Sequence, residues 1–173
     1  MTLTLEEKMV KIFVIGPYES GKSTVVRALT SGKSVSVDEL DTTIAFDYGY
    51  TFINMREVHV FGAPGHDRFG FLREILSNGA CGFILVVDST APETFSKALE
   101  ILKQVNPGLE KPFVIVANKQ DKPGALSPEH VAEEFKLIGL EKDAPIIPAV
   151  ATSERGVKEA LNKLLELIEK SWG

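Results

Sequence analysis

Residues 16–23, GPYESGKS, have the types and spacing that a phosphate-binding loop requires. Gly16 and Gly21 permit backbone angles that turn successive N–H groups toward an anion. The Lys22 ammonium can reach the β- and γ-phosphates of a nucleotide, and the Ser23 hydroxyl can ligate Mg²⁺. A hydrophobic run precedes the loop and a helical pattern follows it, so the positive helix end points at the same place. The residues predicted to bind phosphates here are Gly16, Tyr18, Glu19, Ser20, Gly21, Lys22, Ser23 and Thr24.

The stretch NKQD, residues 118–121, predicts which base the nucleotide carries. A carboxylate at Asp121 can accept hydrogen bonds from N1–H and the exocyclic amine of guanine, whereas adenine offers no such pair of donors. A site with these acceptors rejects the wrong base because its polar groups would stay unpaired. Asn118 can connect the neighbouring loops, and the Lys119 stem can lie over the flat base. The pattern therefore favours GTP over ATP.

The elements that must position these loops follow from hydrophobic runs and helical periodicity. Near-continuous apolar runs, typical of strands buried on both faces, occur at 8–16, 82–88, 111–118 and 144–150. Helical patterns are expected at about 22–30, 67–78, 92–105, 128–138 and 156–170. Residues 43–62 break the alternation and predict an antiparallel hairpin joined near 54–56, while the polar segment 30–42 is expected to be a mobile loop. Together these elements predict a doubly wound α/β fold with a single GTP-binding domain over residues 1–173.

Composition excludes several other classes of protein. The 173 residues are 44% hydrophobic and 25% charged, as in globular domains, and the net charge of −5 argues against a nucleic-acid partner. No apolar run has the length of about 18 residues that a membrane span needs. The sequence has no signal-peptide pattern, no site for a lipid anchor and one cysteine, Cys81, which agrees with a reducing compartment. We expect a cytoplasmic protein.

With both loops in place, the sequence resembles a Ras-like small GTPase over essentially its whole length. The resemblance implies a small G-protein fold, with a mixed sheet of six strands in the order 2-3-1-4-5-6, one antiparallel pair and about five helices. It implies GTP/GDP and Mg²⁺ as ligands. In the fifth family loop, AVATS (149–153), it assigns the backbone N–H of Ala151 to the guanine oxygen, with Thr152 beside it.

The first switch is assigned through the same resemblance. The run TIAFDYGY (43–50) is similar to the segment in which the family carries a threonine that ligates Mg²⁺ and senses the γ-phosphate. This implies that Thr43, together with Ser23, forms the metal site; Thr42 is the alternative. No arginine occurs between Ser31 and Ile44, so this segment offers no catalytic arginine in cis.

The second switch differs from the family pattern D-x-x-G followed by Gln or His. Here the run is Gly62-Ala63-Pro64-Gly65-His66. Gly65 keeps the N–H that meets the γ-phosphate and His66 stands at the water-orienting position, so the implied catalytic residues are His66, Lys22 and Gly65. Gly62 replaces an aspartate that holds Mg²⁺ through a water. The Mgl-type bacterial and archaeal GTPases, which associate with roadblock-fold proteins, also lack this acid, and the run is most similar to theirs.

These features predict a molecular switch with slow GTP hydrolysis. Tyr18 replaces a residue that is often glycine, so its ring would obstruct an arginine finger. Protein partners, including roadblock-fold proteins, are expected to bind residues 31–52 and 63–73. Two alternatives remain open: a GTP-binding interaction module that does not hydrolyse, and a P-loop ATPase or phosphotransferase.

A stripe of aromatic residues leaves a further alternative open. Phe46, Tyr48, Tyr50 and Phe52 share one side of a strand by their period of two. They either pack under a helix as core or form a surface for a partner beside the first switch.

Overall fold

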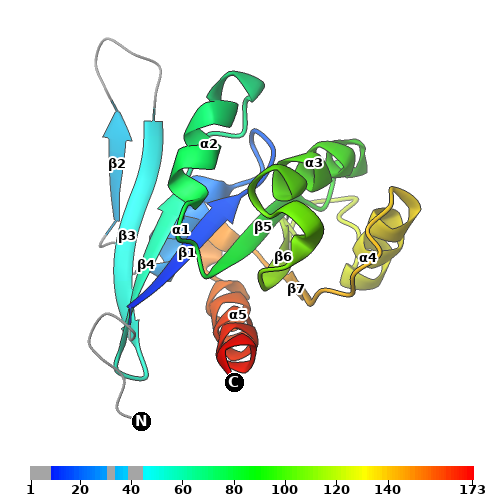
Figure 1. Ribbon diagram of the computed structural model, residues 1–173. Coiled ribbons are helices and arrows are strands. Elements are labelled where there is room, and N and C mark those ends of the chain that lie inside the picture. Colours follow the sequence, from blue (N-terminus) through cyan, green and yellow to red (C-terminus); the bar gives the residue numbers. More distant parts are fainter. Residues whose placement is uncertain (1–8, 31–33, 39–44) are drawn as a thin grey trace.

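The computed structural model describes residues 9–30, 34–38 and 45–173, which form a twisted sheet with helices on both faces (Figure 1). The strands are β1 (Met9–Ile15), β2 (Ser34–Asp38), β3 (Ala45–Ile53), β4 (Arg56–Gly62), β5 (Gly82–Asp88), β6 (Phe113–Asn118) and β7 (Ile146–Pro148). The α-helices of the described residues are α1 (Lys22–Leu29), α2 (Gly70–Ser77), α3 (Phe95–Val105), α4 (Pro128–Leu137) and α5 (Val157–Trp172). Short 3₁₀ turns at Asp67–Phe69 and Pro92–Thr94 precede α2 and α3, within the ranges expected to be helical.

The strand order is β2-β3-β4-β1-β5-β6-β7. Without β2, the six remaining strands have the predicted order 2-3-1-4-5-6 and one antiparallel pair, β3 with β4, so the small G-protein fold is confirmed. The segment 30–42 was expected to be a loop, and this was wrong for Ser34–Asp38, which pairs antiparallel with β3 at the sheet edge. Its sequence, SVSVD, alternates with a period of two, a strand pattern that the polar composition of the segment obscures.

Two hydrophobic layers sandwich the sheet. On one face, Ile12 and Val14 of β1 pack in a cluster with residues of α1 and α5. On the other face, Phe13 and Ile15 belong to a cluster with residues of α3 and α4. Alternate residues of β1 therefore face opposite layers, which explains its continuous hydrophobic sequence.

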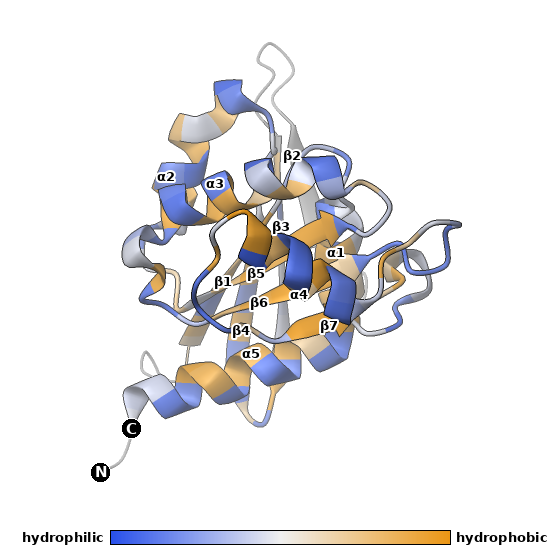
Figure 2. Ribbon diagram, turned by 90° about the vertical axis from the view of Figure 1, so that its right-hand side faces the viewer, coloured by the Kyte–Doolittle hydropathy of each residue, from blue (hydrophilic) through white to orange (hydrophobic). Residues whose placement is uncertain are grey.

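Helix α5 shows how the helices cover the sheet. Its residues Val157, Leu161, Leu164, Leu165 and Ile168 are all buried. Figure 2 shows hydrophobic and hydrophilic residues alternating along α5, as expected for a helix with one face on a core. Among the residues that the structure describes, none of the helices combines the length and hydropathy needed to cross a membrane.

The aromatic stripe of β3 does not form core along its whole length. Tyr48 is half-buried and lies 4.8 Å from Phe61, ring centre to ring centre, whereas Tyr50 is exposed and 63% of Phe52 is accessible. The other side of the strand faces α1, because a Cβ added at Gly49 would lie 2.5 Å from Thr30 Cγ2. The core alternative is therefore wrong for Tyr50 and Phe52.

One stability prediction follows from the packing of α4. Phe135 is fully buried and stacks on Phe95 of α3 with ring centres 4.9 Å apart. We expect Phe135→Ala to lower the free energy of unfolding by about 3–5 kcal/mol, because it leaves a cavity between the helices. Leu137→Ala on the same helix is the control; Leu137 is 79% exposed, and its loss should change stability by less than about 0.5 kcal/mol. Equal effects in urea denaturation would contradict this account of the core.

Candidate nucleotide-binding site

The predicted phosphate loop connects β1 to α1. The helix begins at Lys22, so its free N–H groups face the loop. Gly21 has φ = 102°, and a Cβ at this position would lie 2.3 Å from the Asn118 amide nitrogen. Only glycine satisfies both the angle and the space, so the sequence pattern here reflects a backbone requirement.

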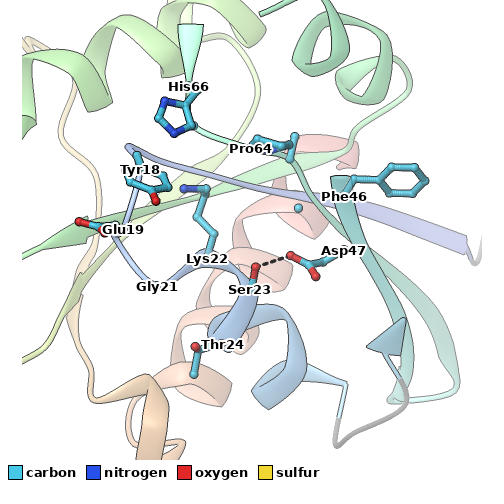
Figure 3. A pocket seen from close by; sticks show the side chains of 13 residues that line it. Tyr18, Glu19, Gly21, Lys22, Ser23, Thr24, Phe46, Asp47, Pro64 and His66 are labelled. Carbon is cyan, nitrogen blue, oxygen red and sulfur yellow. Dashed lines mark hydrogen bonds between the residues drawn. The ribbon is translucent and has the colours of Figure 1, made fainter. Parts of the chain in front are cut away.

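A pocket of about 380 Å³ opens beside this loop. Figure 3 shows its lining, which comes from the phosphate loop, the start of α1, β3 and the second switch. The lining residues are Tyr18, Glu19, Gly21, Lys22, Ser23, Thr24, Phe46, Asp47, Gly62, Ala63, Pro64, Gly65 and His66. The structure therefore brings the predicted catalytic residues and the predicted phosphate-binding residues other than Gly16 and Ser20 around one cavity.

Lys22 is held inside this pocket. Its side chain is buried, and its ammonium donates a hydrogen bond of 2.6 Å to the carbonyl oxygen of Pro17. Burial and, to a smaller extent, the Arg73 charge lower the pKa of Lys22, Asp47 opposes them, and the resulting pKa is about 8. An arriving phosphate would raise the pKa again, since it favours the charged form.

The hydroxyl of Ser23 is oriented by a carboxylate. It donates a hydrogen bond of 2.5 Å to Oδ2 of Asp47, which reaches it from β3 (Figure 3). Two oxygen-bearing side chains thus meet at the pocket wall. Oxygen ligands, few in number and completed by phosphate and water, suit Mg²⁺. The residues present therefore fit the cation that the predicted nucleotide requires.

The second switch packs closely on the phosphate loop. A Cβ at Gly65 would lie 2.5 Å from the Gly16 carbonyl oxygen and 2.6 Å from the Tyr18 nitrogen, so this contact requires glycine. The next residue, His66, places its ring against that of Tyr18, with centres 4.2 Å apart. The water-orienting candidate thus rests on the aromatic residue of the loop.

Arg73 of α2 holds the backbone of the second switch through hydrogen bonds. It is buried, and its Nη1 donates hydrogen bonds to the carbonyl oxygens of Pro64 and His66 at 3.0 and 2.9 Å. Its Nε donates to Gln104 of α3 at 3.1 Å. The guanidinium therefore couples the backbone around Gly65 to two helices.

The base-reading candidates lie at the ends of β6 and β7. Asn118 donates from Nδ2 to the Ser20 carbonyl oxygen and accepts at Oδ1 from the Ala151 N–H, both at 3.0 Å. Lys119 donates to the Glu19 carbonyl oxygen at 2.8 Å. The loops that were expected to read phosphate and base are therefore joined by direct hydrogen bonds.

A carboxylate orients Lys119 as well. Asp88, at the end of β5, lies 2.9 Å from its ammonium. Burial alone would raise the pKa of Asp88, but hydrogen bonds from Thr90 and Lys119 outweigh it, and the pKa is lowered. The lowered pKa favours the ionised form of Asp88, which holds the Lys119 ammonium at the end of β5.

The remaining predicted residues are either exposed or lie outside the residues that the structure describes. Asp121 and Thr152 are exposed on their loops. Thr43, assigned to Mg²⁺, and its alternative Thr42 lie outside the described residues.

Sequence reasoning missed three residues of the site: Asp47, Arg73 and Asp88. Asp88 ends a hydrophobic strand, which is a position where polar residues gather in such folds, so that signal was available. Asp47 and Arg73 act through cross-strand and helix contacts that no local pattern records.

The strand order, the phosphate loop after β1 and the loop after β6 define a small G-protein domain. The model of the ADP-ribosylation factor family matches residues 1–168. The chain therefore belongs to this family of small GTPases, and GTP/GDP with Mg²⁺ are the ligands that the family implies.

Individual relatives agree with this assignment. ADP-ribosylation factor-like protein 1 of Saccharomyces cerevisiae is 28% identical over 94% of this chain and 90% of its own length. The uncharacterised protein MJ1339 of Methanocaldococcus jannaschii is 29% identical over 93% of this chain and 98% of its own. GTPase Obg of Anoxybacillus flavithermus is 32% identical over 96% of this chain, which spans only 42% of that protein.

The pKa of Lys22 predicts how nucleotide affinity depends on pH. With a pKa of about 8 in the nucleotide-free protein, the ammonium that attracts phosphate is lost as the pH rises above that value. The bound form keeps its proton to higher pH, so the Kd for GDP should increase by up to about tenfold per pH unit above pH 8. Fluorescence titration from about pH 7 to about pH 9 measures this.

Lys22→Arg is the control for that titration, because a guanidinium stays charged over the whole range. It should bind GDP more weakly at every pH but lose the pH dependence. A wild-type Kd that stays constant through pH 8 would contradict the electrostatic role of Lys22.

Proposed function

We propose that this protein is a GTP-binding molecular switch that hydrolyses GTP slowly and cycles between GTP and GDP forms to engage protein partners. The observation that carries the proposal is the pair of hydrogen bonds in which Asn118 donates to the Ser20 carbonyl oxygen and accepts from the Ala151 N–H. They join the phosphate loop to the base loops, so that one nucleotide can contact both.

The proposed mechanism depends on position and electrostatics. The loop N–H groups and Lys22 neutralise phosphate charge, and the Gly65 N–H donates to the γ-phosphate. His66 orients the attacking water. Mg²⁺, held at Ser23 and Thr43, would withdraw charge from the β- and γ-phosphates. In this scheme the protein forms no covalent bond to the substrate.

Slow turnover is supported by the contact between Tyr18 and His66. A histidine that packs on an aromatic ring must leave it before it can orient water beside the γ-phosphate. We expect the same ring to obstruct an arginine from a Ras-type activator. Activation by a partner would therefore require another geometry, one that moves Tyr18 or completes the site from a different side.

Partner binding is proposed for residues 31–52 and 63–73. The described parts of both segments expose apolar side chains: Tyr50 and Phe52 on β3, and Phe71 at the start of α2. Apolar residues beside a switch favour a protein partner. A roadblock-fold protein is the partner suggested by the similarity of the second switch to Mgl-type GTPases, and the setting proposed is the cytoplasm.

The contact of His66 with Tyr18 also favours a second candidate, a GTP-binding interaction module without hydrolysis. In that case nucleotide would order the loops and no turnover would follow. A P-loop ATPase or phosphotransferase is the remaining alternative. Its preference for GTP or ATP distinguishes it from the first two candidates.

Base specificity is tested at Asp121. Asp121→Asn should weaken GTP binding by roughly 10²- to 10⁴-fold, because two hydrogen bonds to a charged acceptor are lost. Xanthosine triphosphate should bind this variant better than GTP does, since its 2-oxo group accepts from the new amide. Competition titrations against fluorescent GDP measure both affinities. Preference of the wild type for ATP would refute the guanine assignment.

Hydrolysis is tested at His66. His66→Ala should slow single-turnover GTP hydrolysis by about 10²-fold, the lower end of the range for a positioned side chain in proton transfer, and leave the Kd for GTP unchanged. His130→Ala, on α4 and away from the pocket, is the control and should hydrolyse at the wild-type rate. Measurable hydrolysis that is equal in all three proteins would remove the role of His66. No hydrolysis in any of them would favour the interaction module.

A further inference from the structure

Position 62 of the second switch lacks a carboxylate, but the space beside it contains one. Asp47 of β3 pairs directly with Gly62 of β4 in the antiparallel ladder. A Cβ added at Gly62 would lie 3.7 Å from Asp47 Cβ and 3.8 Å from its Oδ2. Side chains directly opposite each other in such a pair lie on the same face of the sheet. The Asp47 side chain therefore enters the region that an acidic residue at 62 would reach.

The contacts of Asp47 are those of a metal-supporting group. Its Oδ2 accepts the hydrogen bond from the Ser23 hydroxyl at 2.5 Å, and it lines the pocket together with Lys22. A carboxylate that accepts from a ligating hydroxyl orients the ligand and increases its basicity. In Figure 3 the carboxylate points from β3 toward Ser23 at the start of α1.

We propose that Asp47 supplies, from β3, the carboxylate of the Mg²⁺ site that position 62 no longer provides. Asp47 is a positioning residue: it acts on the cation through the Ser23 hydroxyl and through its charge. The inference rests on the proposed function, since the cation is bound together with the nucleotide phosphates.

The charge of Asp47 should change the strength of nucleotide binding in opposite directions in the presence and in the absence of Mg²⁺. Without Mg²⁺, a carboxylate beside the phosphate loop repels the phosphates and weakens nucleotide binding. With Mg²⁺, it would attract the cation that is bound together with the phosphates. Asp47 should therefore increase the dependence of nucleotide binding on Mg²⁺, whereas a residue with a purely structural role would change both conditions alike.

The test uses the full chain and the release of a fluorescent GDP analogue, in excess Mg²⁺ and in excess EDTA. Asp47→Asn keeps an oxygen that can accept from Ser23 and removes the charge. We expect the ratio of the two release rates to fall by about 10- to 100-fold, with faster release in Mg²⁺ and equal or slower release in EDTA. Asp143→Asn, at an exposed position, is the matched control and should keep the wild-type ratio.

Mn²⁺ provides a readout that does not depend on nucleotide kinetics. It accepts the same oxygen ligands as Mg²⁺, and its paramagnetic resonance reports binding directly. The Kd of Mn²⁺ for the GDP complex should rise by about 10-fold or more in Asp47→Asn. A wild-type Kd in that variant, together with a wild-type release ratio, would overturn the role of Asp47.

A double variant tests whether the carboxylate can return to β4. Gly62→Asp in the Asp47→Asn background requires Val26 to shift, because the new Cβ lies 3.0 Å from its Cγ2. We expect the release ratio and the Mn²⁺ affinity to recover toward wild type. No recovery in a double variant that binds GDP normally in EDTA would contradict the proposed exchange of positions.

The outcomes separate this inference from the function on which it rests. If the wild type does not bind GDP or GTP, the proposed function fails. If the wild type binds with a strong Mg²⁺ dependence that Asp47→Asn leaves unchanged, only the inference about Asp47 fails.

Discussion

The rest of the site depends on the hydrogen bonds of the buried Asn118 side chain. One amide at the end of β6 donates to the phosphate loop and accepts from the loop after β7. The amide nitrogen of Asn118 also leaves no space for a side chain at residue 21, because a Cβ there would lie 2.3 Å from it. Gly21 also has a positive φ of 102°, so both the angle and the space require glycine at the residue before α1, which begins with Lys22 inside the pocket. A single buried amide thus joins the loops predicted to bind the base to the loop predicted to bind the phosphates.

Much of the fold and the phosphate and base loops could be predicted from the sequence. The strands of the central sheet are buried on both faces, so their hydrophobic runs are continuous and each run ends where a loop begins. In parallel sheets these ends meet at one edge, so GPYESGKS and NKQD could be placed together without coordinates. Gly16, Gly21 and Gly65 were informative because packing against other parts of the site leaves no space for a Cβ at these positions.

The features that escaped prediction depend on contacts between distant residues. The sequence shows that Gly62 lacks a carboxylate, but only the register of β3 on β4 shows that Asp47 stands opposite it. The period of two in β3 marks one side of the strand but not what covers that side; α1 lies on the other side, so Tyr50 and Phe52 stay exposed. Edge strand β2 was missed because its polar residues resemble those of a loop.

The move of a carboxylate from β4 to β3 changes which switch the cation site belongs to. Gly62 begins the second switch, whereas Asp47 lies on β3 within the run 43–50 that was assigned to the first switch. Lys22 lines the pocket as a cation, and Asp47 opposes the effect of burial and of Arg73 on its pKa. A carboxylate in this place disfavours phosphate alone and favours phosphate with a divalent cation. In the proposed site, nucleotide and cation would be coupled through one side chain of β3, while Arg73 holds the backbone of the second switch around Gly65.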